Sequence, residues 1–494
     1  MGAPLLDARL PDPVNELSDD QLGRAAARGG VWSIAGETSS RAGQSIVFFV
    51  LAGFLSPAQF GAAAVAFVCV QVTSSLTYAG FGAAVQVLGP DLRRDRTAVG
   101  MALVMGSTGA IALALLAGPI SDAFGVPSAT GLVRLIGLAL PLAQTSEVIS
   151  ALLARELRFD LTGKAAIVGS VVAAAAGLSL AAAGAGPGAL VAQGVAQPGV
   201  RLLVLLLSRP SFLRVALHRA EMGQVWHVGR ELLLGGVFET AATNVDNVVV
   251  GAVAGAAALG AYGFAYNLTA LPLFVVGLAV SRVALPIYAR MRALDEPLGG
   301  AFLNALELTS WLTALPLGFL AVAGPAALDV IFGHKWDLIS SALRLLALHG
   351  WLRAVESASG SALIASGQAR ITRRVQQWQL VIAAALLVPL VELRGAFGAA
   401  VAITTAVGLG TSYSMFQSTR RTGAARPVVL LRMAEAALGG CAGGAAGLLV
   451  LVGLDGLSSL LLAVLAATLS WTLAFTLLRP STTARAVRLL RPAR

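Results

Sequence analysis

Long apolar segments follow one another along most of the chain, with short polar connections between them. Each is about 20 residues long, the length that an α-helix needs to cross the hydrocarbon core of a bilayer. Transmembrane β-strands would be shorter and would alternate apolar with polar positions, whereas these segments are apolar on all sides. The pattern predicts an all-α integral membrane fold of about fourteen helices: 29–54, 58–80, 98–120, 128–154, 161–184, 187–208, 228–253, 256–288, 299–323, 338–365, 373–391, 395–417, 427–452 and 457–478.

Composition supports this interpretation and gives an orientation. Hydrophobic residues make up 57% of the chain and charged residues only 12%, about half the charged share of soluble domains. The net charge of +10 comes from arginines in alternate connections, a pattern that favours topology and lipid headgroups over nucleic acid. On the other side the connections hold only Lys335 and Arg394. The positive-inside rule therefore predicts that both termini lie in the cytoplasm.

Two pairs of similar segments indicate a duplication. Leu51–Phe67 resembles Val250–Tyr266, and Gly188–Ala192 resembles Gly398–Ala402. A parallel repeat of this kind predicts two pseudo-symmetric six-helix bundles that face each other across a central cavity and allow alternating access. The predicted organisation is an N-terminal cytoplasmic tail (1–28), an N-lobe (29–208), a linker (209–227), a C-lobe (228–417), two extra helices with a preceding basic loop (418–478) and a basic tail (479–494).

Charged residues within the apolar segments are candidates for function, because a charge at membrane depth is costly and usually faces protein or water. Glu37, Arg41 and Gln44 share one face of the first helix, and the seventh helix carries a polar stripe at the corresponding place. A purely structural alternative is ion pairing, as for Glu37 with Arg41 or for Arg353 with Glu356 at i and i+3. Glu147 and Arg201 lie near helix ends, where long side chains can extend to the membrane surface.

The types of these residues suggest two roles. Arginine keeps its charge when buried and matches phosphate oxygens in a two-pronged geometry, and the acids could couple transport to H⁺ or Na⁺. Candidates for substrate binding in the cavity are Arg41, Gln44, Arg344, Arg353, Asn244 and Asn247. Candidates for ion coupling are Glu37, Glu239, Asp246 and Glu307.

Motifs for other kinds of chemistry do not occur in the sequence. It has no G-x-x-x-x-G-K-[ST] loop for ATP, and its four histidines lack the spacing of a metal site. We therefore predict neither catalytic residues, nor a metal, nor a cofactor, and expect a transporter rather than an enzyme.

Several longer segments resemble one family. The stretches RAAARGGVWSIAGETSSRAGQSIVFFVLAGFLSPAQFGAAAVAF, ALLARELRFDLTGKAAIV, NVDNVVVGAVAGAAALGAYGFAYNLTALP and AVSRVALPIYARM are similar to bacterial polysaccharide repeat-unit flippases. These belong to the multidrug/oligosaccharidyl-lipid/polysaccharide exporter superfamily. The resemblance implies two six-helix lobes and a cavity whose cations, Arg41 above all, bind the pyrophosphate of an undecaprenyl-linked oligosaccharide. It implies a multi-pass protein of the bacterial inner membrane that transfers this substrate from the cytoplasmic to the periplasmic leaflet for exopolysaccharide, O-antigen or capsule assembly.

Two other transport functions share this scaffold. A multidrug/cation antiporter would favour an acidic, aromatic-lined cavity, whereas this chain is only 6% aromatic and carries several arginines within its apolar segments. A lipid II flippase would share the preference for cations. The expected partners are the lipid-linked oligosaccharide, the bilayer and a polysaccharide polymerase with its chain-length machinery, without nucleic acid.

Overall fold

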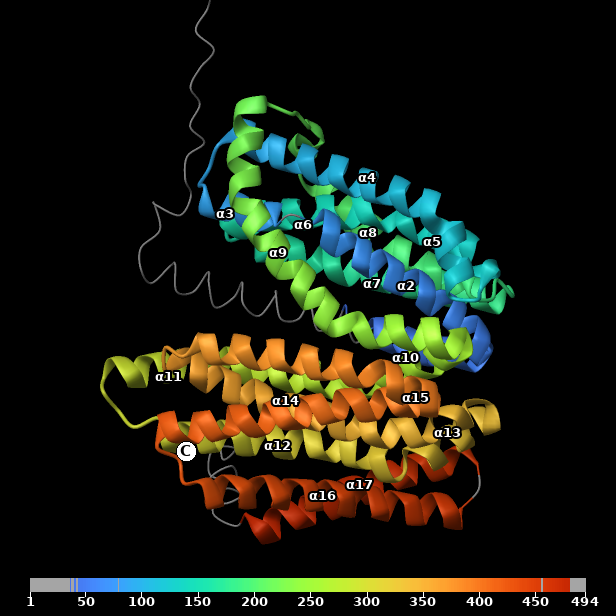
Figure 1. Cartoon of the computed structure of the whole chain (residues 1–494), viewed down its shortest axis with the longest axis vertical. Coiled ribbons are helices and arrows are strands. Elements are labelled where there is room, and N and C mark those ends of the chain that lie inside the picture. The colour runs from blue at the N-terminus through green and yellow to red at the C-terminus, as the bar shows by residue number, and fades with distance from the viewer. Residues whose placement is uncertain (1–35, 37–39, 41–42, 79, 455, 480–494) are drawn as a thin grey trace, which may run out of the picture. The chain divides into compact units, whose positions relative to one another are not determined.

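The computed structural model describes residues 36, 40, 43–78, 80–454 and 456–479, and these are almost entirely helical, without a β-strand (Figure 1). Eleven stretches of the described residues are long and apolar enough to cross a membrane. The predicted all-α membrane fold is thereby confirmed. The helices form two compact units, each described here by itself: unit 1 extends to Val248 and includes Gly255–Gly260, and unit 2 holds Val249–Ala254 and the chain from Ala261 onward.

Unit 1 packs its helices around an apolar core that includes Phe81, Val99, Ile149 and Leu205. Helix α2 begins with a capping box, in which Ser56 and Gln59 each accept a bond from the other's backbone N–H. The elements are α2 (Pro57–Thr77), α3 (Phe81–Val87), α4 (Leu92–Ala123), η1 (Pro127–Ala129), α5 (Thr130–Gly137), α6 (Ala139–Arg155), α7 (Phe159–Ala182), α8 (Gly188–Ser208), η2 (Pro210–Leu213) and α9 (Arg219–Val249), preceded by helical residues 43–54.

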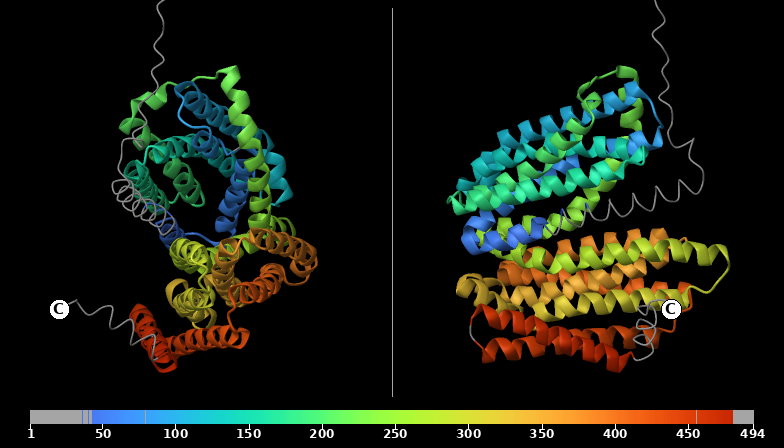
Figure 2. Two further views of the ribbon diagram at one scale, coloured as in Figure 1. Left: turned by 90° about the vertical axis from the view of Figure 1, so that its left-hand side faces the viewer. Right: turned by 180° about the vertical axis from the view of Figure 1, so that it is seen from behind.

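Unit 2 contains the remaining helices (Figure 2). Its longest, α15, is broken at Gly395, whose φ of 55° lies in the left-handed region that favours glycine. Its two halves fold back on each other, so that Gln379 contacts Gly410, and they correspond to the predicted spans 373–391 and 395–417. The elements are η3 (Val250–Ala254), α10 (Gly255–Pro272), η4 (Leu273–Gly277), α11 (Leu278–Ala293), α12 (Gly299–Val322), α13 (Gly324–Phe332), η5 (Gly333–Ile339), α14 (Ser340–Ala365), α15 (Ala369–Thr422), α16 (Arg426–Gly453) and α17 (Leu457–Leu478).

A ladder of hydroxyl groups fixes α14 against the second half of α15. Thr404 donates to the carbonyl oxygen of Leu345 at 3.3 Å, and Thr411 donates to that of Leu352 at 3.4 Å. One heptad further on, Ser418 donates to the carbonyl oxygen of Ser359 at 3.1 Å. The constant seven-residue spacing shows that the two helices run parallel with a coiled-coil-like periodicity.

Two local features occur at places that the predicted duplication would relate to each other. The turn after α6 has a positive φ at Leu157, and the turn after α14 has one at Gly367. The residue after each of these closes the turn in the same way: the Arg158 N–H donates to the carbonyl oxygen of Leu153, and the Gln368 N–H donates to that of Leu363. The second feature is a reciprocal contact of α2 with the first residues of α10. A Cβ atom on Gly61 would lie 1.8 Å from the carbonyl oxygen of Ala256, and one on Gly260 would lie 2.4 Å from that of Pro57.

Helix α16 depends on glycine for its contact with α12. A Cβ atom on Gly440 would lie 2.3 Å from the backbone oxygen of Ala314. We expect Gly440→Ala to destabilise the protein by about 1–3 kcal/mol, because backbone must move to admit the methyl group. Gly453→Ala on the same helix is the control, since a Cβ there meets nothing within 4 Å. Thermal unfolding in detergent measures both, and equal unfolding temperatures would contradict the prediction.

Candidate functional site

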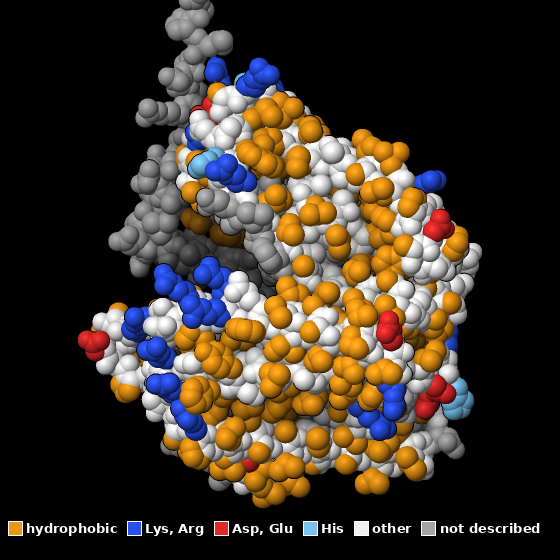
Figure 3. All heavy atoms as spheres, in the orientation of Figure 1, with side chains coloured by type: hydrophobic (Ala, Val, Ile, Leu, Met, Phe, Trp, Pro, Cys, Tyr) orange, Lys and Arg blue, Asp and Glu red, His pale blue; other side chains and the backbone are white. Residues whose placement is uncertain are grey.

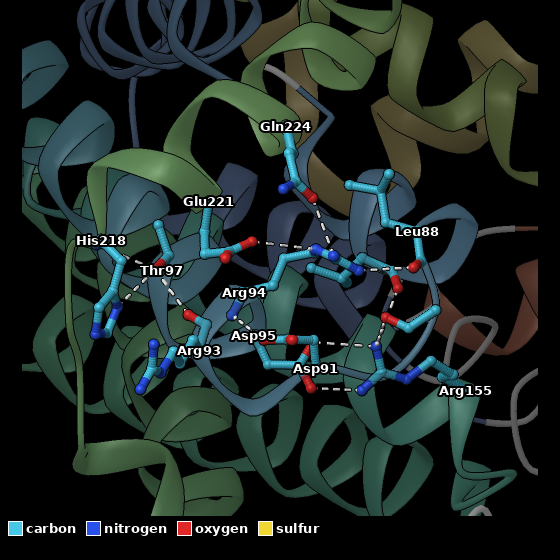
Figure 4. Close-up of polar contacts among 12 residues, drawn as sticks. Leu88, Asp91, Arg93, Arg94, Asp95, Thr97, Arg155, His218, Glu221 and Gln224 are labelled. Atoms are coloured by element: carbon cyan, nitrogen blue, oxygen red, sulfur yellow. Dashed lines mark hydrogen bonds and ion pairs between the residues drawn. The ribbon is translucent and has the colours of Figure 1, made fainter. Parts of the chain in front are cut away.

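A network of charges joins α3, α4, α6 and the start of α9 at one end of unit 1 (Figure 4). The Arg155 guanidinium donates to both carboxylate oxygens of Asp95, at 3.0 and 2.5 Å. It also donates to the carbonyl oxygens of Val85 and Gly89 at 3.0 and 3.2 Å. Both terminal nitrogens of the Arg155 guanidinium thus bond within its own chain, which is typical of a structural arginine.

Arg94 extends the same network to α9. It donates to the carbonyl oxygen of Leu88 at 2.7 Å and to Gln224 at 2.9 Å, and it lies 3.6 Å from Glu221. Beside it, His218 Nδ1 lies 3.2 Å from the Thr97 hydroxyl. These contacts hold the start of α9 and the segment before it against α4. Because Arg94 and Arg155 already pair with carboxylates of the chain, they are poor candidates for binding a ligand.

A more open pair lies within the helices of unit 1. Arg201 on α8 is 3.2 Å from the Glu147 carboxylate on α6 and donates to Ser150 at 2.9 Å. The Glu147 side chain remains 51% exposed, and the Arg201 Nε is buried without a hydrogen-bond partner among the described atoms. Instead of extending separately to the membrane surface, the two side chains therefore pair with each other, and the Arg201 side chain stays 28% exposed.

Unit 2 holds a second such pair, on α14. Arg353 lies 3.5 Å from Glu356, as the i, i+3 spacing predicted. The Glu356 side chain is buried and accepts a bond from Gln379 on α15 at 2.9 Å. His349, also buried, occupies the same face of α14, and its ring lies 6.0 Å from that of Tyr266. Because Arg353 is partly exposed and has no closer acidic partner among the described residues, its guanidinium can still engage an anion.

Glu307 lies in a different setting. It is buried in α12 and forms ion pairs with Arg432 of α16 and, at 3.5 Å, with Arg479 after α17. Arg479 also pairs with Glu435. This closed cluster joins the last two helices to α12. No local sequence pattern predicts this cluster, because its members are far apart along the chain.

The structure places the other candidates as follows. Arg344 and Gln44 are exposed, and Asn244 is buried with bonds from its amide to Thr240 and Thr243. Asn247 donates to the buried Asp246 at 3.4 Å. Glu37, Arg41 and the Glu239 side chain lie outside the described residues. Among the candidates, Asn247 and Asp246 contact each other. The functional roles assigned to all of the candidates stay predictions.

Comparison with known proteins identifies the family. A family model described as polysaccharide biosynthesis protein matches residues 50–341, more than half of the chain. The chain belongs to the polysaccharide biosynthesis protein family. Membership confirms the family resemblance noted in the sequence.

Relatives within this family differ in the polymer that their names mention. The succinoglycan biosynthesis transport protein ExoT of Rhizobium meliloti (strain 1021) is 30% identical over 64% of this chain and 64% of its own length. The teichuronic acid biosynthesis protein TuaB of Bacillus subtilis (strain 168) is 28% identical over 48% of this chain and 50% of its own. The chain thus spans less than two thirds of either relative. The lipopolysaccharide biosynthesis protein WzxC of Escherichia coli (strain K12) is 25% identical over 72% of each chain.

Two solved structures are similar to this chain in fold. The lipid II flippase MurJ, in an inward closed conformation, has a TM-score of 0.74 and 13% identity, covering 92% of this chain and 99% of MurJ. An outward-facing multidrug resistance MATE family transporter of the MOP superfamily has a TM-score of 0.52 and 16% identity, covering 81% and 95%. At these identities the likeness concerns the fold alone.

The Arg155–Asp95 pair yields a stability prediction. We expect Asp95→Asn to cost about 1.5–3 kcal/mol, because it removes charge-assisted bonds at a largely buried position. Asp160→Asn is the matched control: its partners Arg158 and Lys164 are 3.6 and 3.8 Å away and half exposed, so we expect a loss within about 1 kcal/mol. Unfolding temperatures in detergent compare the two, and an equal loss would show that the buried pair adds nothing.

Proposed function

We propose that the chain is a flippase that moves undecaprenyl-pyrophosphate-linked oligosaccharide repeat units from the cytoplasmic to the periplasmic leaflet. It would act by alternating access in the bacterial inner membrane, with both termini in the cytoplasm, and supply exopolysaccharide, O-antigen or capsule assembly. The activity is transport rather than catalysis. Family membership and the names of ExoT, TuaB and WzxC support the link to surface polysaccharides.

The observation that carries the proposal is an arginine paired only loosely with a carboxylate inside each unit. Arg201 and Arg353 lie in apolar helices, where an unneeded charge would be costly. Their side chains are 28% and 35% exposed and lie 3.2 and 3.5 Å from their carboxylates. A diphosphate could therefore replace or join the carboxylate at the arginine. In the empty carrier, the carboxylate balances the charge of the arginine.

The two alternatives use the same fold and differ in chemistry. A multidrug/cation antiporter would be served by acids free of arginine, whereas Glu147, Glu307 and Glu356 each have an arginine partner. A lipid II flippase would need the same diphosphate recognition, and the likeness to MurJ concerns only the fold. The polysaccharide names of the sequence relatives favour the repeat-unit substrate.

Deletion of the gene tests the proposed substrate. We expect undecaprenyl-linked oligosaccharide to accumulate on the cytoplasmic face and surface polymer to be lost, because polymerisation requires the flipped lipid. Analysis of extracted lipid-linked oligosaccharide and of surface polymer measures both, with a plasmid copy of the gene as control. Unchanged polymer together with lost dye efflux would instead support the multidrug antiporter, and accumulation of lipid II would support the other alternative.

Paired substitutions on α14 separate substrate binding from charge balance. We expect Arg353→Gln to reduce complementation of the deletion strain at least about tenfold, since a guanidinium–phosphate contact is charge-assisted. If Arg353 only neutralises Glu356, the double variant R353Q/E356Q will regain activity; if it binds diphosphate, the double variant will stay inactive. Surface polymer is the readout, with membrane levels of each variant checked by immunoblotting. Wild-type activity of R353Q would remove Arg353 from the site.

A further inference from the structure

Eight exposed arginines gather at one end of unit 2. The elements that carry them meet there: Arg292 of α11 donates to the carbonyl oxygen of Ala365 at 2.7 Å, and the backbone of Gly299 lies beside that of Thr422. The hairpin form of α15 returns both of its ends to the same place. Figure 3 shows basic side chains concentrated at this end. The residues are Arg290, Arg292, Arg370, Arg373, Arg374, Arg420, Arg421 and Arg426.

These arginines lack the carboxylates that the network of unit 1 supplies. In unit 1, Arg94, Arg155 and Arg209 each pair with an acid. None of the eight in unit 2 forms an ion pair with a described acidic residue, although Asp295 and Glu296 lie in the loop after α11. The orientation of a membrane protein explains positive charge at a cytoplasmic end. It does not explain why the arginines at these four helix ends have no carboxylate partners among the described residues. The surface therefore fits an anionic partner.

Two of the arginines contact the same ring. The Arg426 guanidinium lies 4.2 Å from the centroid of Phe416, and that of Arg420 lies 5.8 Å from it. Cation–π contact orients both groups and uses none of their N–H donors. An anion bound beside the ring could accept bonds from these donors, and phosphate oxygens match guanidinium geometry.

Exposed apolar side chains adjoin this pair along α15 and α16. On α15, Leu409, Tyr413 and Phe416 follow one another at i, i+4 and i+7 and are 56%, 49% and 40% exposed. On α16, Leu430 and Leu431 follow Arg426 and are 63% and 57% exposed. A cationic pair beside such side chains matches a molecule with an anionic head and a hydrocarbon chain, whereas an acidic peptide would make no use of the apolar side chains.

We propose that Arg420 and Arg426, which both contact Phe416, form a headgroup site for an anionic phospholipid of the cytoplasmic leaflet. The phosphate accepts bonds from the guanidinium groups, the acyl chains lie along Leu409 and Tyr413, and the other six arginines attract the headgroup electrostatically. This site does not depend on the substrate proposed above, because it takes a resident lipid and does not include Arg353.

Lipid binding to the purified full-length chain tests the site directly. Native mass spectrometry of the protein in neutral detergent would follow titration with phosphatidylglycerol or with phosphatidylcholine of the same acyl chains. We expect the wild type to prefer phosphatidylglycerol by about tenfold or more, and R420Q/R426Q to lose roughly thirtyfold in affinity for it. The R420K/R426K variant, which retains the charges, should keep most of the binding and shows whether changes at these positions disturb folding.

An equal loss of charge elsewhere is the control. Arg214 and Arg219 are exposed arginines before and at the start of α9, and R214Q/R219Q should bind phosphatidylglycerol as the wild type does. The proposal fails if the wild type shows no preference for the anionic lipid, if R420Q/R426Q binds it normally, or if the control loses as much. Displacement of phosphatidylglycerol by a polyglutamate peptide at similar concentration would assign the surface to an acidic protein instead.

Discussion

Helices in a lipid bilayer gain little by burying apolar side chains against each other, since the surrounding acyl chains are just as apolar. Close contact between backbones has to hold the bundle together, and here it depends on positions without a side chain. Gly318, Gly440 and Gly444 bring α12 and α16 so near that a methyl group on any of them would meet backbone atoms within 2.5 Å. The same device joins α2 to the first residues of α10. The arrangement of the charged groups rests on this packing, because it determines which helix ends meet.

The charges then divide into closed and open groups. Arg155 with Asp95, and Glu307 with Arg432 and Arg479, are groups whose partners come from separate helices and which therefore join those helices. Arg201 and Arg353 have partly exposed side chains, each beside a single carboxylate. In a low-dielectric setting an arginine with spare bonding capacity is costly unless something else uses it. The loose pairs are therefore better candidates for contact with a moving anion than the closed clusters.

Local patterns in the sequence predicted much of this structure, but they did not predict contacts between residues that are far apart along the chain. The apolar segments predicted the helices, including the break between 391 and 395 that Gly395 provides. The i, i+3 spacing predicted the pair of Arg353 with Glu356. The partners of Glu307 could not be predicted, because Arg432 and Arg479 approach it only through the packing of α16 and α17 on α12. Likewise, nothing in the sequence around Phe416 indicates that two arginines from different helices share its ring.

The hydroxyl ladder between α14 and α15 restricts how unit 2 can move. Thr404, Thr411 and Ser418 each bond to a carbonyl oxygen on the neighbouring helix, at intervals of seven residues. A small slide along the common axis would break all three bonds at once, and the next position that restores the spacing lies about 10 Å away. The two helices are thus coupled as one stiff element, and Arg353, which α14 carries, changes its surroundings only when that whole element turns.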